Sequence, residues 1–171
     1  MTRRFAGFAP APAERTPTPQ HSGRLMERQK QWITDADTFF ISTRHPESGA
    51  DLSHRGGNPG FVRILDDRTL VFPDYSGNNL FNTLGNLKID QRAGLLFLDF
   101  ESGHVLQLSG TAEILWEEEV QGLHDFPGAN RFVRYRIDET VQINEDLRSR
   151  YLFDAYSPYN PGGTGWEGTT G

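Results

Sequence analysis

Short polar turns separate the β-type segments of this 171-residue sequence, and that spacing restricts the fold more than any other feature. Phe61–Leu65 (FVRIL) and Thr69–Phe72 (TLVF) are separated only by Asp66-Asp67-Arg68, so they predict a β-hairpin. Parallel strands need crossover connections of about a dozen residues or more. The sequence therefore favours an antiparallel sheet and disfavours a doubly wound one.

The other β-type segments extend this sheet to about six strands, which predicts a mainly β fold with added helices. Thr38–Arg44 (TFFISTR) is rich in aromatic and β-branched residues, and His104–Trp116 is a long strand with a kink expected at Gly110. Pro73 is expected to end the second strand of the hairpin. Two further strands are expected over Arg92–Phe100 and Phe132–Ile143. We interpret the whole as an antiparallel barrel.

Helices are expected between some of these strands. Apolar residues near i, i+3 and i+4 spacing predict a helix over Ser22–Asp37. A second, short helix is expected over Asn78–Leu84, with Gly85-Asn86 at its end, and an acidic one over Glu117–Leu123. The segment His45–Gly60 is interpreted as a loop because it is rich in Gly, Pro and polar residues.

The length of the chain suits one folded domain between two tails. Residues 1–22 are rich in Pro and Ala and contain Thr-Pro repeats, which predicts a flexible N-terminal tail. Residues 157–171 are rich in Pro and Gly, which predicts a flexible C-terminal tail. The folded domain is therefore expected over residues 23–156, without internal repeats.

Charge and composition exclude several classes of function. A net charge of −6 with scattered Lys and Arg argues against a nucleic-acid partner. The absence of Cys excludes disulfides, thiol nucleophiles and iron–sulfur clusters, and no metal site is predicted. No apolar run approaches the roughly 20 residues of a membrane span, and the N-terminus lacks the apolar core of a signal peptide. We expect a cytoplasmic protein without a membrane partner.

Three features that suit a planar anionic ligand lie between Ser53 and Leu87. The glycines of the segment SHRGGNPG allow the backbone to approach a ligand closely. Arg55 and Arg63 supply positive charge that can hold a phosphate through two parallel hydrogen bonds. A helix is expected to begin just after the segment Asp74–Asn79 (DYSGNN), and the free N–H groups at a helix start favour an anion.

Each of these features also has a purely structural explanation. The glycines can serve a loop that needs positive φ angles, and Arg63 can face solvent from its strand. The helix start can be an ordinary capped turn. Each feature alone leaves both explanations open, and it is their clustering that favours a binding site.

The same region carries a family resemblance. The segment DLSHRGGNPGFVRILDDRTLVFPDYSGNNLFNTLGNL, followed by RAGLLFLDF, resembles the pyridoxamine 5'-phosphate oxidase-like flavoproteins. Within them it is most similar to the subgroup with the SHRGGxPGFV and FPDYxGN signatures. The similarity covers residues 32–116. It implies a split β-barrel that works as a homodimer, with two FMN sites at the subunit interface.

The resemblance also implies which residues hold FMN. By position, Arg63 corresponds to a basic phosphate ligand of the family, and the segment Pro73–Tyr75 lines the flavin. The full set of implied cofactor-binding residues is Arg55, Phe61, Val62, Arg63, Pro73, Asp74, Tyr75, Ser76, Asn78 and Asn79. The resemblance assigns no catalytic residue.

One departure from the family concerns its phosphate clamp. True pyridoxamine phosphate oxidases follow this turn with a Ser-Arg-Lys triplet, whereas Asn78, Asn79 and Leu80 stand here. Two amides can still donate hydrogen bonds, but two positive charges are gone, and Arg55 can replace one of them. The C-terminal motif that binds the substrate phosphate in those oxidases has no clear match, so oxidation of vitamin B6 is not predicted.

The leading hypothesis is an FMN-dependent oxidoreductase that acts on an unidentified small molecule, with NAD(P)H as a candidate electron donor. One alternative is a flavin-binding protein without turnover, such as a carrier or redox sensor. Another is a split barrel that binds heme or a deazaflavin, in which case His54 or His104 is the candidate axial ligand. His54 is also a candidate for proton transfer or for the flavin edge, or it is a loop histidine bonded to its own backbone.

Overall fold

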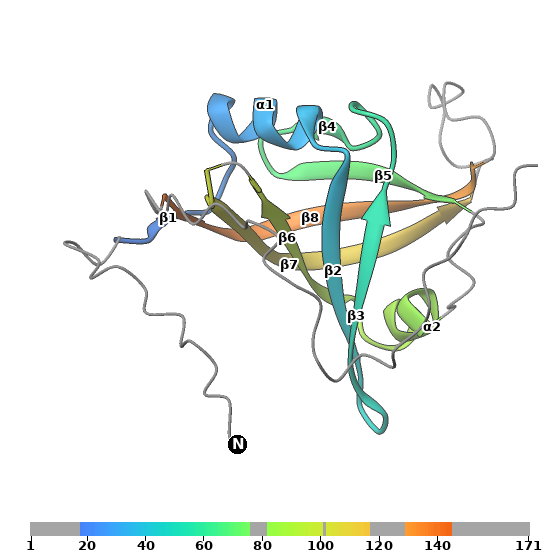
Figure 1. The fold of residues 1–171 in the computed structure, drawn as a ribbon. Helices are drawn as coiled ribbons and strands as arrows, with labels where there is room; N and C mark the ends of the chain where they lie inside the picture. The colour runs from blue at the N-terminus through green and yellow to red at the C-terminus, as the bar shows by residue number, and fades with distance from the viewer. Residues whose placement is uncertain (1–17, 76–81, 101, 117–128, 145–171) are drawn as a thin grey trace, which may run out of the picture.

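The computed structural model describes residues 18–75, 82–100, 102–116 and 129–144, which form one antiparallel sheet of eight strands with two helices (Figure 1). The order across the sheet is β3-β2-β6-β7-β8-β5-β4, and β1 pairs with β8 off this path. The helices are α1 (Glu27–Asp35) and α2 (Asn82–Ile89). The strands are β1 (Gln20–Ser22), β2 (Thr38–His45), β3 (Gly49–Gly56), β4 (Arg63–Asp66), β5 (Thr69–Tyr75), β6 (Arg92–Leu98), β7 (Val105–Trp116) and β8 (Ala129–Ile143).

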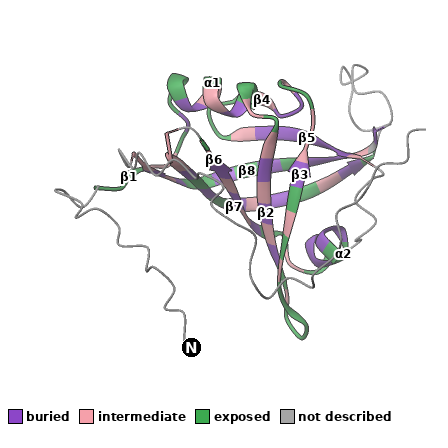
Figure 2. Cartoon of the chain, viewed as in Figure 1, coloured by how far each residue is buried: buried purple, intermediate pink, exposed green. Residues whose placement is uncertain are grey.

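The two halves of the sheet curl toward each other and share one core. The Phe39 ring on β2 lies 4.9 Å from the Phe72 ring on β5 and 5.2 Å from the Phe97 ring on β6. Because β2 and β5 are far apart in the strand order, the contact between Phe39 and Phe72 requires the sheet to curl round. Figure 2 shows buried residues alternating with more exposed ones along the strands, as expected for a sheet with one face on a core.

The kink predicted at Gly110 is present as a shift of register between β7 and β8. A Cβ at Gly110 would lie 2.0 Å from the backbone oxygen of Arg136, so only glycine allows this close approach of the two strands. The hydroxyl of the buried Tyr135 beside it donates to the backbone oxygens of Ala93 at 2.9 Å and Leu108 at 3.0 Å. Tyr135 thereby ties three strands together inside the core.

Helix α1 covers one end of the barrel (Figure 1), and an amide on its inner side fastens it there. The buried Gln29 side chain donates from Nε2 to Oε1 of Gln142 on β8 at 2.8 Å. Its own Oε1 accepts from the Met26 N–H at 2.9 Å, at the start of the helix. Gln29 therefore satisfies a backbone donor at the helix start and anchors the helix to the sheet.

Strand β3 is the main correction to the sequence prediction. The segment expected as a loop, His45–Gly60, contains this strand, which pairs with β2 from Gly49 to Gly56. Arg55 is the one buried residue of β3, so the strand lacks the apolar alternation by which strands are recognised. At the edge of the described sheet, β3 is held mainly by backbone hydrogen bonds to β2, which leave little trace in the pattern of side chains.

The N-terminal prediction was also wrong in its bounds. Helix α1 begins at Glu27 rather than at Ser22, because Gln20–Ser22 form strand β1 and pair with β8. The end of the expected flexible tail therefore belongs to the sheet. With β1 and β3 added, the described residues form eight strands where about six were expected.

Helix α2 continues through Gly85 and Asn86, which were expected to end it. Its expected start lies outside the described residues. Leu84 and Leu87 are buried, and the Asn86 Nδ2 donates to the Thr43 Oγ1 at 3.0 Å. These contacts with the body of the barrel outweigh the low helix propensity of Gly85.

The hairpin after β3 is present but shifted. Strand β4 begins at Arg63, so the predicted strand Phe61–Leu65 is displaced toward the turn. Pro73 does not end β5, which continues to Tyr75. Because β4 pairs only with the first part of β5, the missing N–H of Pro73 interrupts no bond with β4. The register of β5 on β8 shifts between Pro73 and Tyr75.

The remaining predicted strands agree with the structure to within a few residues. Thr38–Arg44 corresponds to β2, Arg92–Phe100 to β6 and His104–Trp116 to β7, and Phe132–Ile143 lies within β8. The expected acidic helix over residues 117–123 lies outside the described residues.

Candidate cofactor site

Arg55 is a buried cation at the edge of the barrel. It lies opposite Phe39 in the β2–β3 pair, so its side chain is on the inner face of the sheet and is only 6% exposed. Its Nη1 donates to the backbone oxygen of His54 at 3.1 Å. Burial lowers the pKa of the Arg55 guanidinium, and the negative charges of Asp74 and then Asp51 oppose that shift.

A second buried charge lies where β5 meets β8. The Asp74 carboxylate is 6% exposed, and its Oδ2 lies 3.0 Å from the Nη2 of Arg131, whose side chain is 25% exposed. The backbone pairing of β5 with β8 brings the two residues together, since Pro73 lies opposite Phe132. Asp74 therefore has one arginine in direct contact and a second, Arg55, close enough to act through its charge.

Hydroxyl groups hold the second carboxylate near Arg55. The Oδ2 of Asp51 accepts hydrogen bonds from Ser53 Oγ at 2.9 Å and from Thr83 Oγ1 at 3.0 Å. Thr83 lies in α2 and is buried, so this small network ties the helix to β3. Hydrogen bonds from Ser53 on β3 and from Thr83 on α2 therefore fix the position of Asp51.

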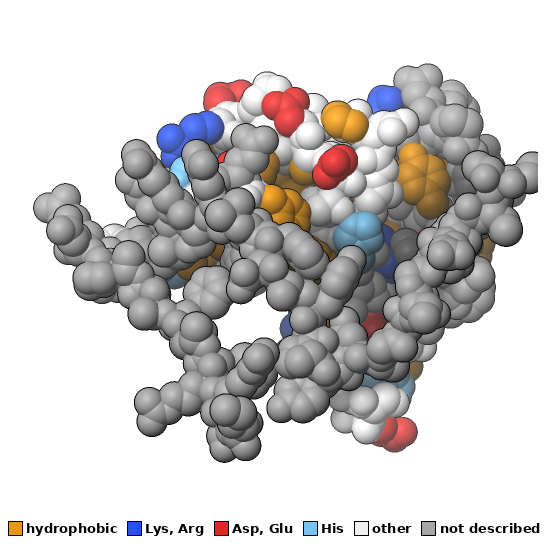
Figure 3. Space-filling model, viewed as in Figure 1, with side chains coloured by type: hydrophobic (Ala, Val, Ile, Leu, Met, Phe, Trp, Pro, Cys, Tyr) orange, Lys and Arg blue, Asp and Glu red, His pale blue; other side chains and the backbone are white. Residues whose placement is uncertain are grey.

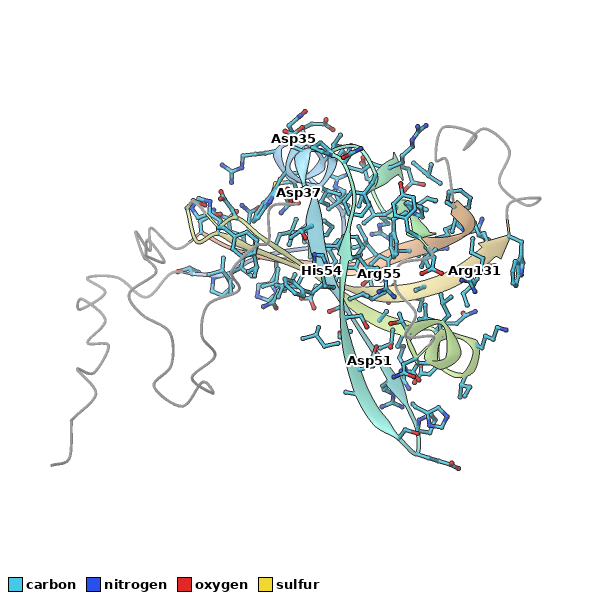
Figure 4. The ribbon with its side chains drawn as sticks, turned by 45° about the vertical axis from the view of Figure 1, so that its right-hand side comes forward. Asp35, Asp37, Asp51, His54, Arg55 and Arg131 are labelled. Atoms are coloured by element: carbon cyan, nitrogen blue, oxygen red, sulfur yellow. The ribbon has the colours of Figure 1, made fainter. Side chains whose placement is uncertain are left out.

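The four charged groups of this region balance one another. Arg55 and Arg131 bring two positive charges, and Asp51 and Asp74 bring two negative ones. Figure 4 labels Asp51, Arg55 and Arg131, which come from β3 and β8. Arg55 and Asp74 are buried, and Asp51 and Arg131 are half-buried. A balanced set of donors and acceptors of this kind suits a neutral polar edge that alternates acceptors and donors, as the pyrimidine edge of a flavin ring does. It offers no excess positive charge to a phosphate.

The structure places two of the predicted cofactor residues in the core. Phe61 and Val62 are 3% and 1% exposed, and the Phe61 ring stacks on Phe39 with the centroids 5.7 Å apart. Their side chains shape the inside of the barrel. That these two residues contact a cofactor stays a prediction.

The other predicted residues lie on β4, on β5 or outside the described residues. Arg63 is half-buried at the start of β4, where it lies opposite Val71. Pro73 is buried and Tyr75 is half-buried near the end of β5. Ser76, Asn78 and Asn79 lie outside the described residues. Of the predicted set, the structure thus brings Arg55 and Asp74 together.

His54 points to the opposite side of β3 from Arg55. It lies opposite Phe40, and the two rings meet edge-on with centroids 5.7 Å apart. Its Nε2 is hydrogen-bonded to the Thr38 hydroxyl. One prediction was that the His54 ring bonds to its own backbone. The structure shows instead a hydrogen bond to Thr38 on the neighbouring strand β2.

Three residues of this region were not predicted from the sequence, namely Asp51, Thr83 and Arg131. Asp51 lies in the segment taken for a loop, and Arg131 directly precedes a predicted strand without any motif of its own. Only the pairing of β5 with β8 reveals that Arg131 faces Asp74. A β–β pairing predicted between these two segments was the one signal that could have found it.

The described part of the chain holds no group of three or more His, Cys, Asp or Glu side chains that fits a metal ion. Nor does it contain a helix long and apolar enough to cross a membrane.

Solved structures with this fold include proteins of several bacteria. A Lactobacillus delbrueckii protein provisionally assigned as a pyridoxamine 5'-phosphate oxidase is 18% identical, with a TM-score of 0.57 over 70% of this chain and 94% of its own. A variant of HupZ from group A Streptococcus is 15% identical, with a TM-score of 0.55 over 68% and 98%. A conserved hypothetical protein of Mycobacterium tuberculosis is 16% identical, with a TM-score of 0.50 over 74% and 90%. At these identities the likeness establishes the fold, a split β-barrel.

The comparison of sequences points to the same group. None of the curated proteins matches the chain. The family model described as pyridoxamine 5'-phosphate oxidase matches residues 25–150, which is well over half of the sequence. This chain therefore belongs to the pyridoxamine 5'-phosphate oxidase family.

Proposed function

We propose that this protein is an FMN-dependent oxidoreductase that acts on a small molecule other than pyridoxamine phosphate. The observation that carries the proposal is the buried Arg55 at the edge of the barrel, whose charge interacts with those of Asp74 and Asp51. Burying an arginine costs free energy unless an acidic neighbour or a ligand balances its charge. Such groups, with perturbed pKa values, concentrate at functional sites.

The residues divide into two roles toward the flavin. Arg63 would hold the phosphate, with Ser76, Asn78 and Asn79 as implied partners. Arg55 and Asp74 would face the polar edge of the ring. A bound flavin supplies the transfer of electrons to or from a substrate. The protein residues bind and orient it, and the Arg55 guanidinium stabilises negative charge at the edge that it faces.

We further propose that the working form is a homodimer. Phe40 lies opposite both His54 on β3 and Leu96 on β6, so all three side chains are on the outer face of the sheet. Leu52 on the same face is 68% exposed. On the described part of the surface, Figure 3 shows hydrophobic side chains in small, separate patches. An outer sheet face of this kind favours contact with a second copy.

The first experiment is to purify the protein, record its visible spectrum and identify any released chromophore by mass. We expect a yellow protein that releases FMN. A deazaflavin or a heme in its place would support the alternative ligands and contradict the proposal. A colourless protein that also fails to bind added FMN would contradict it as well.

Substitutions then assign the residues. Arg63→Gln is expected to weaken FMN binding about tenfold or more, because a charged hydrogen bond to the phosphate is lost. The matched control is Arg28→Gln, which removes an exposed arginine on α1 and should leave FMN binding unchanged. Equal FMN affinity in the Arg63→Gln variant and the wild type would remove Arg63 from the site.

Turnover separates an enzyme from a passive binder. If the protein is an oxidoreductase with a nicotinamide donor, NADH or NADPH should bleach the flavin band within seconds to minutes. A band that persists with both nucleotides and with chemical donors of similar potential would favour a binding or sensing role. Leu52→Glu tests the dimer by light scattering, since a charge on the proposed interface should give a monomer that still folds.

A further inference from the structure

An open groove lies on the outer face of the barrel, across the strands β5, β8 and β7. Its volume is about 380 Å³, which falls within the roughly 300–1,000 Å³ of small-molecule sites. Its lining includes the side chains of Leu65, Thr69, Thr111, Glu113, Arg134 and Arg136. None of these residues belongs to the candidate cofactor site described above.

Strand register places the polar residues of the groove in two neighbouring rows. In one row Arg136 on β8 lies between Thr69 on β5 and Thr111 on β7. In the next, Arg134 lies opposite Glu113. Directly opposed residues share one face of an antiparallel sheet, and so do residues two positions apart. The two arginines therefore line the groove because of backbone pairing, whatever rotamers they adopt.

The two arginines differ in how their charge is matched. Arg134 donates from Nη2 to Glu113 Oε2 at 2.6 Å. Within the described ranges, no carboxylate lies within ion-pair distance of the Arg136 side chain. The pKa of Asp66 is lowered first by the Arg68 N–H, then by the Thr69 hydroxyl, and to a lesser extent by the charge of Arg136. The lining of the groove thus holds two positive charges and one negative charge.

An apolar surface lies beside these charges. Leu65 is 56% exposed at the groove. A ligand that fits the lining has an anionic group for the guanidinium and an apolar body for Leu65. We propose that the groove binds a small organic acid, whose carboxylate pairs with Arg136 and whose apolar body lies against Leu65.

The groove is close to the residue proposed for the flavin phosphate. Arg63 lies opposite Val71, which lies opposite Arg134, so Arg63 is in the second row of the same face. The proposed acid site is nevertheless distinct, because its anchor is Arg136 in the first row. Competition between the acid and FMN therefore tests whether the two sites are separate.

The experiment uses benzoate as the probe and benzamide as its uncharged match, with the full chain and whatever cofactor it carries. Binding is measured by saturation-transfer NMR and by calorimetry. We expect benzoate to bind at least about tenfold more tightly than benzamide, because only the carboxylate pairs with a guanidinium. Arg136→Gln should weaken benzoate binding by about the same factor, Arg136→Lys should restore part of it, and Arg28→Gln should leave it unchanged.

Several outcomes would overturn the proposal. Equal binding of benzamide would show that charge is not recognised, and equal binding to the Arg136→Gln variant, folded by circular dichroism, would show that Arg136 is not the anchor. Displacement of benzoate by FMN at FMN's own affinity would make the groove part of the flavin site. If the protein binds no FMN and yet binds benzoate through Arg136, the proposed function fails and this inference stands.

Discussion

The cofactor site and the outer groove both contain an arginine paired with a carboxylate, but the two sites differ in how far these charges are buried. Asp74 is 6% exposed and contacts Arg131, with the buried Arg55 nearby. In the groove, the side chains of Arg134 and Glu113 are 46% and 50% exposed. Both regions pair an arginine with a carboxylate, so the difference between them is burial. A buried charge depends on its partner, whereas water solvates an exposed charge such as that of Arg136 and leaves it accessible to a ligand.

The difference in burial predicts that removing the carboxylate lowers the free energy of unfolding more in the cofactor site than in the groove. Removing one partner of a buried ion pair costs about 3–5 kcal/mol, because the remaining charge is stranded away from water. An exposed pair contributes roughly 0–1 kcal/mol, since water solvates both partners when they separate. A contact between Arg and a carboxylate should therefore add strongly to the free energy of unfolding in the cofactor site and contribute little to it in the groove.

The largest effect is expected for Asp74→Ala. It leaves Arg131 and Arg55 without their shared acidic neighbour, so the free energy of unfolding should fall by about 3 kcal/mol or more. The matched change in the groove, Glu113→Ala, should lower it by less than about 1 kcal/mol. Urea unfolding of both variants without cofactor measures the difference. Similar losses in the two variants would break the comparison.

The next effect concerns the backbone beneath the groove. Gly110→Ala places a methyl group 2.0 Å from the backbone oxygen of Arg136, so β7 and β8 must move apart. We expect a loss of roughly 1–3 kcal/mol or more. In Gly85→Ala the new methyl group meets nothing within 4 Å and lies in a helix. It should stabilise the protein by about 0.5–1 kcal/mol.

Thermal unfolding checks both glycine variants. A shift of the same sign and size at the two positions would mean that the close approach at Gly110 is not what stabilises the kink. Weaker benzoate binding to Gly110→Ala, with Gly85→Ala unaffected, would additionally tie the groove to this register shift.

The fold could be predicted from sequence wherever side chains carry its pattern. The strands with alternating apolar residues and the kink at Gly110 could be recognised because burial on one face selects such residues. Strand β3 could not, since Arg55 is its one buried residue and its pairing with β2 uses backbone groups. Helix α2 runs through Gly85 because contacts made elsewhere in the barrel override local preference.

The residues of the candidate site also differ in whether the local sequence reveals them. Arg55 and Asp74 lie in motifs with a recognisable sequence, so they could be named in advance. Arg131 and Asp51 complete the charge balance but come from segments without any motif. Their roles depend on strand register and on the network with Thr83, which no local pattern encodes.

Thr83→Val tests that network with a smaller effect. The substitution keeps the shape of the buried side chain and removes a hydroxyl that donates to Asp51 at 3.0 Å. Losing a hydrogen bond to a carboxylate should cost about 1.5–3 kcal/mol, toward the lower end because Ser53 remains as a donor. Thr34→Val, on the exposed side of α1, should change stability by less than about 0.5 kcal/mol. Equal losses in urea unfolding would contradict a special role for Thr83.

The smallest effect is expected where a carboxylate is held by exposed arginines, as at Asp90. Its Oδ2 lies 2.7 Å from Arg92 and 2.7 Å from Arg44, whose side chains are 66% and 55% exposed. Hydrogen bonds from Arg92 and then Arg44 hold the pKa of Asp90 below its usual range. A carboxyl group whose pKa is lower in the folded state contributes stability above its unfolded pKa and loses that contribution as the pH falls.

Asp90→Asn should therefore be slightly less stable than the wild type at neutral pH, and the gap between them should close as the pH drops below about 4. Urea midpoints measured from pH 7 downward give this gap directly. Asp35→Asn, where the partner is the Gln31 amide, is the matched variant and should show a smaller gap at neutral pH. A gap for Asp90→Asn that stays constant down to pH 2 would mean that its ion pairs add nothing. Arg44 and Arg92 would then contribute nothing to stability through Asp90.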